Sequence, residues 1–251
     1  ALMREINMDL FYEEMMKVVD VLEGKEMDNI RKASEVCADT IAQGGVVHVF
    51  GSGHSVGFGM ELAGRPGSLV PFHTIVTSDF VLHGKVSLAE FKDPDNIFER
   101  RADIADRLYD LYDIRPQDSF IIISNSGING VVIDFAIKAK QEGHKVIVVT
   151  SWQHTSAEAS RHPSGKKLYE MGDVVIDNCG PQGDALIETG KIEKICSISS
   201  ITGAFIAQSI TTETCRLLSE RGVELPLLLS EDSEENRKHN AELRQKYAGR
   251  I

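Results

Sequence analysis

The stretch HVFGSGHSVGFGMELAGRPG, residues 48–67, passes from an apolar segment through glycine, serine and histidine into a segment of helical character. A strand, a polar turn and a helix in this order are typical of a parallel sheet, in which ligands bind beyond the carboxyl ends of the strands. Backbone amides at the start of the following helix attract anions there. Gly51 and Gly53 allow close approach to the backbone, and Ser52 and Ser55 add hydroxyl donors. The stretch therefore predicts an anion-binding turn in an α/β fold.

The same turn also has features of a dinucleotide-binding loop. Gly51, Gly53 and Gly57 form a GxGxxxG pattern, and Asp79 follows the next apolar run, where an acidic residue would accept a ribose hydroxyl. Position 56 is valine, so the stricter GxGxxG pattern is not met. From this turn alone, a phosphate and a dinucleotide remain open alternatives, as does a tight turn without a ligand.

A second turn of the same kind follows a later apolar run. It lies in FIIISNSGINGVVIDFAIKAKQEG, residues 120–143, and its polar and glycine residues are Ser124, Asn125, Ser126, Gly127 and Asn129. Two turns rich in hydroxyl groups suit one phosphate and its attached polyol, because hydroxyls and amides both donate to phosphate oxygens. A dinucleotide needs only one such turn. The pair therefore favours a sugar phosphate, with capping of the following helix as the alternative for the second turn.

Apolar runs and helical periodicity extend this pattern along the chain. Short apolar runs without alternation predict strands covered on both faces, at residues 46–50, 73–76, 120–123, 146–150 and 174–176. Segments with helical spacing lie at residues 55–64, 95–112, 129–142 and 192–220. We therefore predict an α/β protein, a three-layer αβα sandwich of the doubly wound, flavodoxin-like type with a five-stranded parallel sheet.

Both ends of the chain add helices to this core. Apolar positions at helical spacing predict two helices in residues 1–43, separated at Gly24, and the charged C-terminal extension, residues 223–251, predicts one more. We expect a single domain over residues 1–251, with the sandwich in residues 44–222. The long helix before the extension is apolar on nearly all sides, which predicts burial, partly against a second copy of the chain.

Composition restricts the classes of partner. The 251 residues are 42% hydrophobic, enough for a full core, and 27 basic against 38 acidic residues give a net charge of -11. This charge repels nucleic acid and anionic membranes, so we expect neither as a partner. Four widely separated cysteines and the lack of a long apolar segment are typical of a cytoplasmic protein. No spacing of His, Cys or carboxylates resembles a zinc site, and we expect no metal and no cofactor.

Three motifs together resemble those of the sugar isomerase (SIS) domains. They are GSGHS at residues 51–55, ISNSG at 123–127 and AKQEGHKVIVVT at 139–150, and the resemblance covers about residues 30–220. This family of phosphosugar-binding αβα sandwiches includes phosphoheptose isomerases, which are closest in character, the isomerase half of glucosamine-phosphate synthase, N-acetylmuramic acid phosphate etherase and sugar-sensing regulators. The resemblance implies a sugar-phosphate ligand and a homodimer or homotetramer.

The resemblance also implies which residues contact the ligand. Ser52 and Ser55 match the first loop of the family, and Ser124 and Ser126 match the second. Asn129 departs from the family, which usually has serine or threonine there; its amide still donates a hydrogen bond but lacks the compact hydroxyl.

An aldose–ketose isomerase needs a base that removes the proton beside a carbonyl. Glu61 is the candidate, because MELAGR resembles the ELxGR stretch that carries the catalytic glutamate of phosphoheptose isomerases. The match is one helical turn out of register, a shift of about 6 Å along the helix axis. His54, inside the first turn, is a candidate acid, and His239 is another, since phosphoheptose isomerases resemble this chain in carrying a C-terminal catalytic histidine. For each residue, a role as an ordinary surface group is the alternative.

These residues leave three functions open. The first is a phosphoheptose-like sugar-phosphate isomerase that uses Glu61 as base; the second is an etherase-like lyase that uses the same carboxylate. The third is a sensor that binds a phosphosugar without converting it, although too few residues precede the first strand for a convincing DNA-binding domain. Asp184 and Glu188 are reserve carboxylates that we expect to act as helix caps or surface charges.

Overall fold

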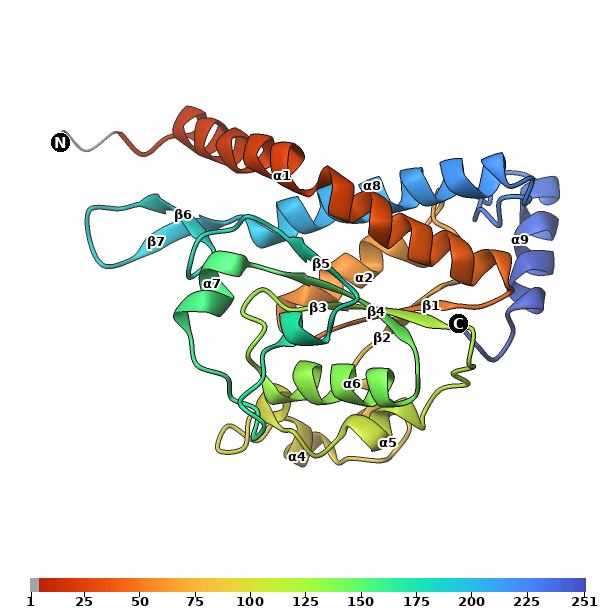
Figure 1. Ribbon diagram of the computed structural model, residues 1–251, viewed down its shortest axis with the longest axis horizontal. Helices are drawn as coiled ribbons and strands as arrows, with labels where there is room; N and C mark the ends of the chain where they lie inside the picture. The colour runs from red at the N-terminus through yellow and green to blue at the C-terminus, as the bar shows by residue number, and fades with distance from the viewer. Residues whose placement is uncertain (1–4) are drawn as a thin grey trace.

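The computed structural model describes residues 5–251 and has an α/β fold built on one parallel sheet (Figure 1). Its five strands lie in the order β2-β1-β3-β4-β5. Their bounds are Val47–Gly51 for β1, Phe72–Ile75 for β2, Ser119–Ile123 for β3, Lys145–Thr150 for β4 and Val174–Asp177 for β5. The predicted αβα sandwich is confirmed, and the strand order is that of a flavodoxin-like fold.

Helices cover both faces of this sheet (Figure 1). The longest of those on the sheet are α1 (Met8–Ala42), α2 (Val56–Leu62), α6 (Gly130–Gln141) and α8 (Ser199–Glu220). Val47 and Val49 point into the core shared with α1, α2 and α8, whereas Phe50 and Phe120 point into the core shared with α6. Successive side chains of a strand point to opposite faces, so both sets must be apolar. This double burial explains the continuous apolar runs in the sequence.

The N-terminal segment differs from the prediction of two helices, because α1 continues through Gly24 without a break. A glycine inside a helix costs only about 1 kcal/mol relative to alanine. The buried residues Leu22, Glu26 and Ile30 lie on one face of α1 across this position, and their burial outweighs that cost. The Glu26 carboxylate also accepts a hydrogen bond from the Asp177 amide at 3.2 Å, which ties α1 to the end of β5.

Gly24→Ala is expected to stabilise the protein by about 0.5–1 kcal/mol. Position 24 is exposed, and no atom lies within 4 Å of the place where a Cβ would stand. Gly44→Ala is the matched control: its surroundings are equally open, but its φ of +73° disfavours alanine, so the effect should have the opposite sign. Urea unfolding of both variants measures the difference, and a destabilised Gly24→Ala would contradict the account of α1.

The prediction of one helix over residues 95–112 is also wrong. Only η2 (Phe98–Arg100) and α5 (Ala105–Tyr109) are helical there. Between them, the Arg101 guanidinium pairs with Glu90 at 2.9 Å and with Asp103 at 2.7 Å, and Arg101 itself is extended. The apolar residues of the segment therefore reach the core from two short helical pieces separated by a bend, and not from one continuous helix. Periodicity alone does not distinguish this arrangement from a helix.

The predicted helix over residues 192–220 begins later, at Ser199, because a two-stranded antiparallel hairpin precedes it. The hairpin consists of β6 (Ala185–Glu188) and β7 (Lys194–Ser197). Asp184 ends the connection from β5 and caps α8: its carboxylate accepts hydrogen bonds from the Ser199 amide at 2.8 Å and the Ser199 hydroxyl at 2.7 Å. One expected role of Asp184, helix capping, is thus observed.

The remaining elements are connections and a C-terminal helix. They are η1 (Gly53–Ser55), α3 (Asp79–Leu82), α4 (Leu88–Phe91), α7 (Trp152–Ala157), η3 (Leu168–Met171) and α9 (Glu234–Lys246). The expected C-terminal helix is present as α9, at the end of the molecule away from the hairpin (Figure 1). Across residues 5–251, none of the helices has the length and apolar character that crossing a bilayer requires.

Candidate functional site

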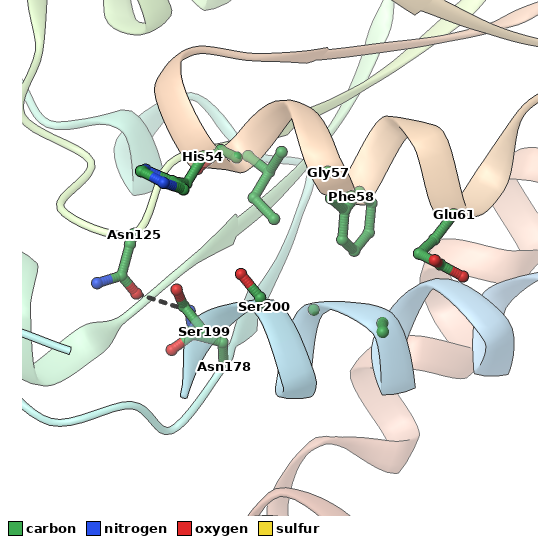
Figure 2. Close-up of a pocket in the computed structure, with 12 residues that line it drawn as sticks. His54, Gly57, Phe58, Glu61, Asn125, Asn178, Ser199 and Ser200 are labelled. Atoms are coloured by element: carbon green, nitrogen blue, oxygen red, sulfur yellow. Dashed lines mark hydrogen bonds between the residues drawn. The ribbon is translucent and has the colours of Figure 1, made fainter. Parts of the chain in front are cut away.

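The strand order places the two predicted turns side by side. β1 and β3 are neighbours, and Gly51 lies opposite Ile123 in their register, so both turns leave the carboxyl edge of the sheet at adjacent points. This is also where the strand order reverses direction, the usual ligand position in a doubly wound sheet. A pocket of about 200 Å³ opens there between α2 and the start of α8 (Figure 2). It is lined by His54, Ser55, Gly57, Phe58, Glu61, Ile123, Asn125, Asn178, Ser199, Ser200, Gly203 and Ala204.

The first turn contributes His54 and Ser55 to the pocket. Gly53 has a φ of +58°, a conformation that glycine adopts without strain. Gly51 is required for a different reason: a Cβ there would stand 2.9 Å from the Ser55 carbonyl oxygen and from an Ile123 methyl group. Its missing side chain therefore lets the turn fold back over the strand. Ser52 is half-buried, but it is not among the lining residues.

The second turn contributes Asn125 rather than its serines. Ser124 is buried, and its hydroxyl accepts a hydrogen bond from the Gly127 amide at 3.1 Å, which holds the turn together. Ser126 is half-buried, outside the lining residues. Asn129 is 9% exposed, and its side-chain oxygen accepts a hydrogen bond from Arg161 at 2.7 Å. Direct ligand contact by these three side chains stays a prediction.

Gly127→Ala is expected to destabilise the second turn by about 2 kcal/mol or more. Gly127 has a φ of +62°, and a Cβ would stand 2.8 Å from the Thr150 hydroxyl. Gly127→Ala combines two causes of destabilisation, the positive φ and the contact with Thr150. Gly143→Ala has only the first, because Gly143 has a φ of +88° with no atom within 4 Å of its Cβ position. Urea unfolding should show a larger loss for Gly127→Ala. Equal losses would mean that contact with Thr150 adds nothing.

Glu61 lies in the wall of the pocket at the opposite end from His54 and Asn125 (Figure 2). Its Oε2 atom accepts hydrogen bonds from Arg65 Nη1 at 2.7 Å and from Gln208 Nε2 at 3.0 Å. Both donors meet the same oxygen, and among the described residues no donor is assigned to Oε1. A carboxylate oxygen that accepts no hydrogen bond keeps its capacity to take up a proton.

The two candidate histidines lie at different ends of the molecule. His54 is exposed and lines the pocket. His239, on α9, is hydrogen-bonded through Nε2 to the Leu227 carbonyl at 3.0 Å. The following part of α9 packs on Val46 and Val70, which lie one residue before β1 and two residues before β2, at the amino ends of these strands. The structure therefore does not bring His239 to the pocket of its own chain.

Sequence analysis missed three polar residues of the pocket: Asn178, Ser199 and Ser200. Asn178 follows β5, and its side-chain amide donates to Asn125 Oδ1 at 2.8 Å (Figure 2). A polar residue directly after an apolar strand is the signal that identified the two turns, and the same rule would have found Asn178. The two serines begin α8, and the start of this helix was not predicted because the hairpin before it was taken as part of the helix.

Two further side chains that can titrate, Cys179 and Glu99, lie next to the residues of the pocket. Burial and the nearby carboxylates of Asp177 and Glu26 raise the pKa of the Cys179 thiol to about 12, so it does not act as a thiolate nucleophile near neutral pH. Glu99 reaches the first turn from η2, with a carboxylate oxygen 3.4 Å from where a Gly53 Cβ would stand. Within the described part of the chain, no group of three or more His, Cys, Asp or Glu side chains is arranged to hold a metal ion.

Sequence comparison gives the family. The pattern that defines the SIS domain matches residues 10–151, more than half of the chain. A UPF0309 protein of Geobacillus kaustophilus (strain HTA426) is 34% identical over 243 residues, 96% of this chain and 94% of that protein. Another, from Listeria monocytogenes serotype 4b (strain CLIP80459), is 35% identical over 237 residues, 94% of each chain.

Structure comparison supports the same fold. A phosphoheptose isomerase of Neisseria gonorrhoeae superposes with a TM-score of 0.55 at 16% identity, covering 82% of this chain and 95% of that one. A phosphoheptose isomerase from Francisella tularensis gives 0.53 at 16% identity, covering 83% and 96%. Because the SIS pattern spans most of the sheet and the UPF0309 proteins align along nearly the whole chain, the protein belongs to the SIS-domain family, among its UPF0309 members.

Proposed function

We propose that the protein binds a sugar phosphate and interconverts its aldose and ketose forms, with Glu61 as the base. The observation that carries this proposal is that one pocket contains Glu61 together with Ser55 and Asn125, one residue from each predicted turn. Its volume of about 200 Å³ lies below the roughly 300–1,000 Å³ of sites for drug-sized ligands. A pocket of this size favours a compact sugar phosphate over a dinucleotide.

The two ends of the pocket suit the two ends of such a substrate. The amides and the Ser55 hydroxyl of the first turn would bind the phosphate, and Asn125 would bind sugar hydroxyls. The carbonyl carbon and its neighbour would then lie toward Glu61. Its carboxylate removes the proton beside the carbonyl, an enediol forms, and the proton returns to the adjacent carbon. No metal or cofactor is needed for this sequence.

A general acid that protonates the carbonyl oxygen completes this mechanism. His54 and Glu61 are the titratable side chains among the described residues that line the pocket, but they lie at its opposite ends (Figure 2), so within one chain we propose His54 as the acid only through water that connects it to the carbonyl oxygen. His239 would serve only in the pocket of a second copy, which requires a homodimer or homotetramer. Sedimentation that gives a monomer at micromolar concentration would contradict this second assignment.

The same pocket suits an elimination in which Glu61 removes a proton and a C–O bond breaks, as well as binding without reaction. Solvent deuterium exchange into a panel of sugar phosphates tests the three functions. Deuterium in recovered and isomerised sugar supports the isomerase, and loss of a substituent supports the lyase. Binding without exchange supports the sensor.

Four free thiols agree with the cytoplasmic location that we propose.

Thermal unfolding identifies which compounds to assay. A ligand at a hundred times its dissociation constant adds about 2.7 kcal/mol to stability. Sugar phosphates are expected to raise the midpoint, and the Ser55→Ala variant should respond less. Stabilisation by nicotinamide dinucleotides but not by sugar phosphates would instead support the dinucleotide alternative of the first turn.

A further inference from the structure

Gln208 joins the candidate base to a helix far away in the sequence. It lies on α8, and its side-chain amide is 3.0 Å from Glu61 Oε2 and 3.4 Å from the Glu61 main-chain carbonyl. The contact crosses 147 positions of the chain. One amide group therefore faces both the side chain and the backbone of Glu61.

This contact ties Glu61 to a second helix, whereas its other partner lies in the same segment of the chain. Arg65 is four positions away on the same turn of chain, and its side chain is 53% exposed, so the pair contributes little rigidity. The Gln208 side chain is exposed as well, but its helix is fixed by the buried residues Ile206, Ala207 and Ile210. Of the two partners, Gln208 is therefore the one that relates the carboxylate to α8, the helix that also lines the pocket.

The chemistry of an amide suits this task. A glutamine side chain neither takes up nor releases a proton near neutral pH, so it cannot replace the base or compete with it. Its N–H donates a hydrogen bond to the Glu61 carboxylate. Because Arg65 and Gln208 both bind Oε2, Oε1 is the oxygen left to take up a proton.

We propose that Gln208 is a positioning residue: its amide holds Oε2 of Glu61 so that Oε1 carries the proton. This inference rests on the proposed function only for its effect on catalysis. The pairing itself has an independent readout, the side-chain amide resonance of Gln208 in the ¹⁵N-labelled protein. We expect that resonance to shift with pH as Glu61 titrates, and to become independent of pH in the same range in Glu61→Gln.

Two substitutions test the effect on proton transfer. Gln208→Met removes the donor at similar size and is expected to lower the exchange rate at saturating substrate about 10–100-fold, with KM nearly unchanged. Gln208→Glu places a second carboxyl group beside Glu61, which is expected to move the acid limb of the pH–rate profile up by about one unit. Thr212→Val, one turn further along α8, is the control and should keep the wild-type profile.

The outcomes separate this inference from the proposed function. If no sugar phosphate undergoes exchange while the Gln208 amide still follows Glu61, the isomerase proposal fails and the pairing stands. If the amide resonance is independent of pH in the wild type, or if Gln208→Met keeps the wild-type rate and pH profile, the positioning role is wrong whatever the substrate.

Discussion

Glu61→Gln is expected to lower the rate of solvent deuterium exchange into the substrate by about 10²–10⁴-fold, the usual contribution of a general base. Glutamine has the size of glutamate, and its side-chain oxygen still accepts hydrogen bonds from Arg65 and Gln208. What it lacks is the ability to take up a proton. The variant should therefore keep its fold and its phosphate contacts while losing the chemical step.

The measurement combines exchange kinetics with thermal unfolding in the presence of the sugar phosphate. Glu35→Gln, at an exposed position of α1, is the control for loss of one negative charge and should exchange at the wild-type rate. Retained exchange in Glu61→Gln would exclude this carboxylate as the base. Equal ligand stabilisation of the wild type and Glu61→Gln, with exchange in neither, would favour the sensor.

The sequence was sufficient to predict the sheet because its chemistry is local. A parallel strand with both faces buried must be a continuous apolar run, and all five strands were found within a residue or two of their observed bounds. The errors arose where tertiary contacts decide the conformation. The ion pairs of Arg101 hold a bend in a segment whose sequence has helical periodicity. Contact with the end of β5 stabilises α1 as one continuous helix across Gly24.

The pocket, too, was predicted only in those parts that local sequence determines. Strand-end chemistry identified Ser55, Asn125 and, through resemblance, Glu61, all of which line it. The sequence of a turn does not reveal which hydroxyl faces a ligand and which holds the turn together, as Ser124 does with the Gly127 amide. The contact between Glu61 and Gln208 has no sequence signal, because two helices from opposite halves of the chain must first pack together.

The second large effect is expected at the other end of the sheet, where Asp118 is fully buried before β3. Its carboxylate accepts hydrogen bonds from Arg250 at 2.6 and 2.7 Å, from His48 at 3.0 Å, and from the amides of Val46 and Arg115. Burial alone would raise the pKa of Asp118. The hydrogen bonds from His48, Arg250 and the two amides outweigh burial and hold that pKa well below its usual range.

Asp118→Ala is expected to destabilise the protein by about 3–5 kcal/mol, because it leaves the buried Arg250 guanidinium with only the Asp113 carboxylate, 3.9 Å away, as an ion-pair partner. Asp39→Ala is the control: this carboxylate is 60% exposed and pairs with Arg221, so its removal should cost less than about 1 kcal/mol. Urea unfolding at pH 7 measures both. Similar losses for the two variants would mean that the buried pair contributes no more than a surface one.

The dependence of stability on pH identifies the contribution of Asp118 itself. Because its folded pKa lies below the unfolded value of 3.8, its stabilisation is complete above about pH 4 and declines as pH falls further. His73 acts in a higher window: burial and the neighbouring His48 lower its pKa from 6.5 to about 4, so its contribution declines as pH falls from 6.5 toward 4. Asp118→Ala should therefore reduce the decline of the unfolding free energy below pH 4 and retain the decline above it. An unchanged slope below pH 4 would show that other carboxylates cause the acid sensitivity.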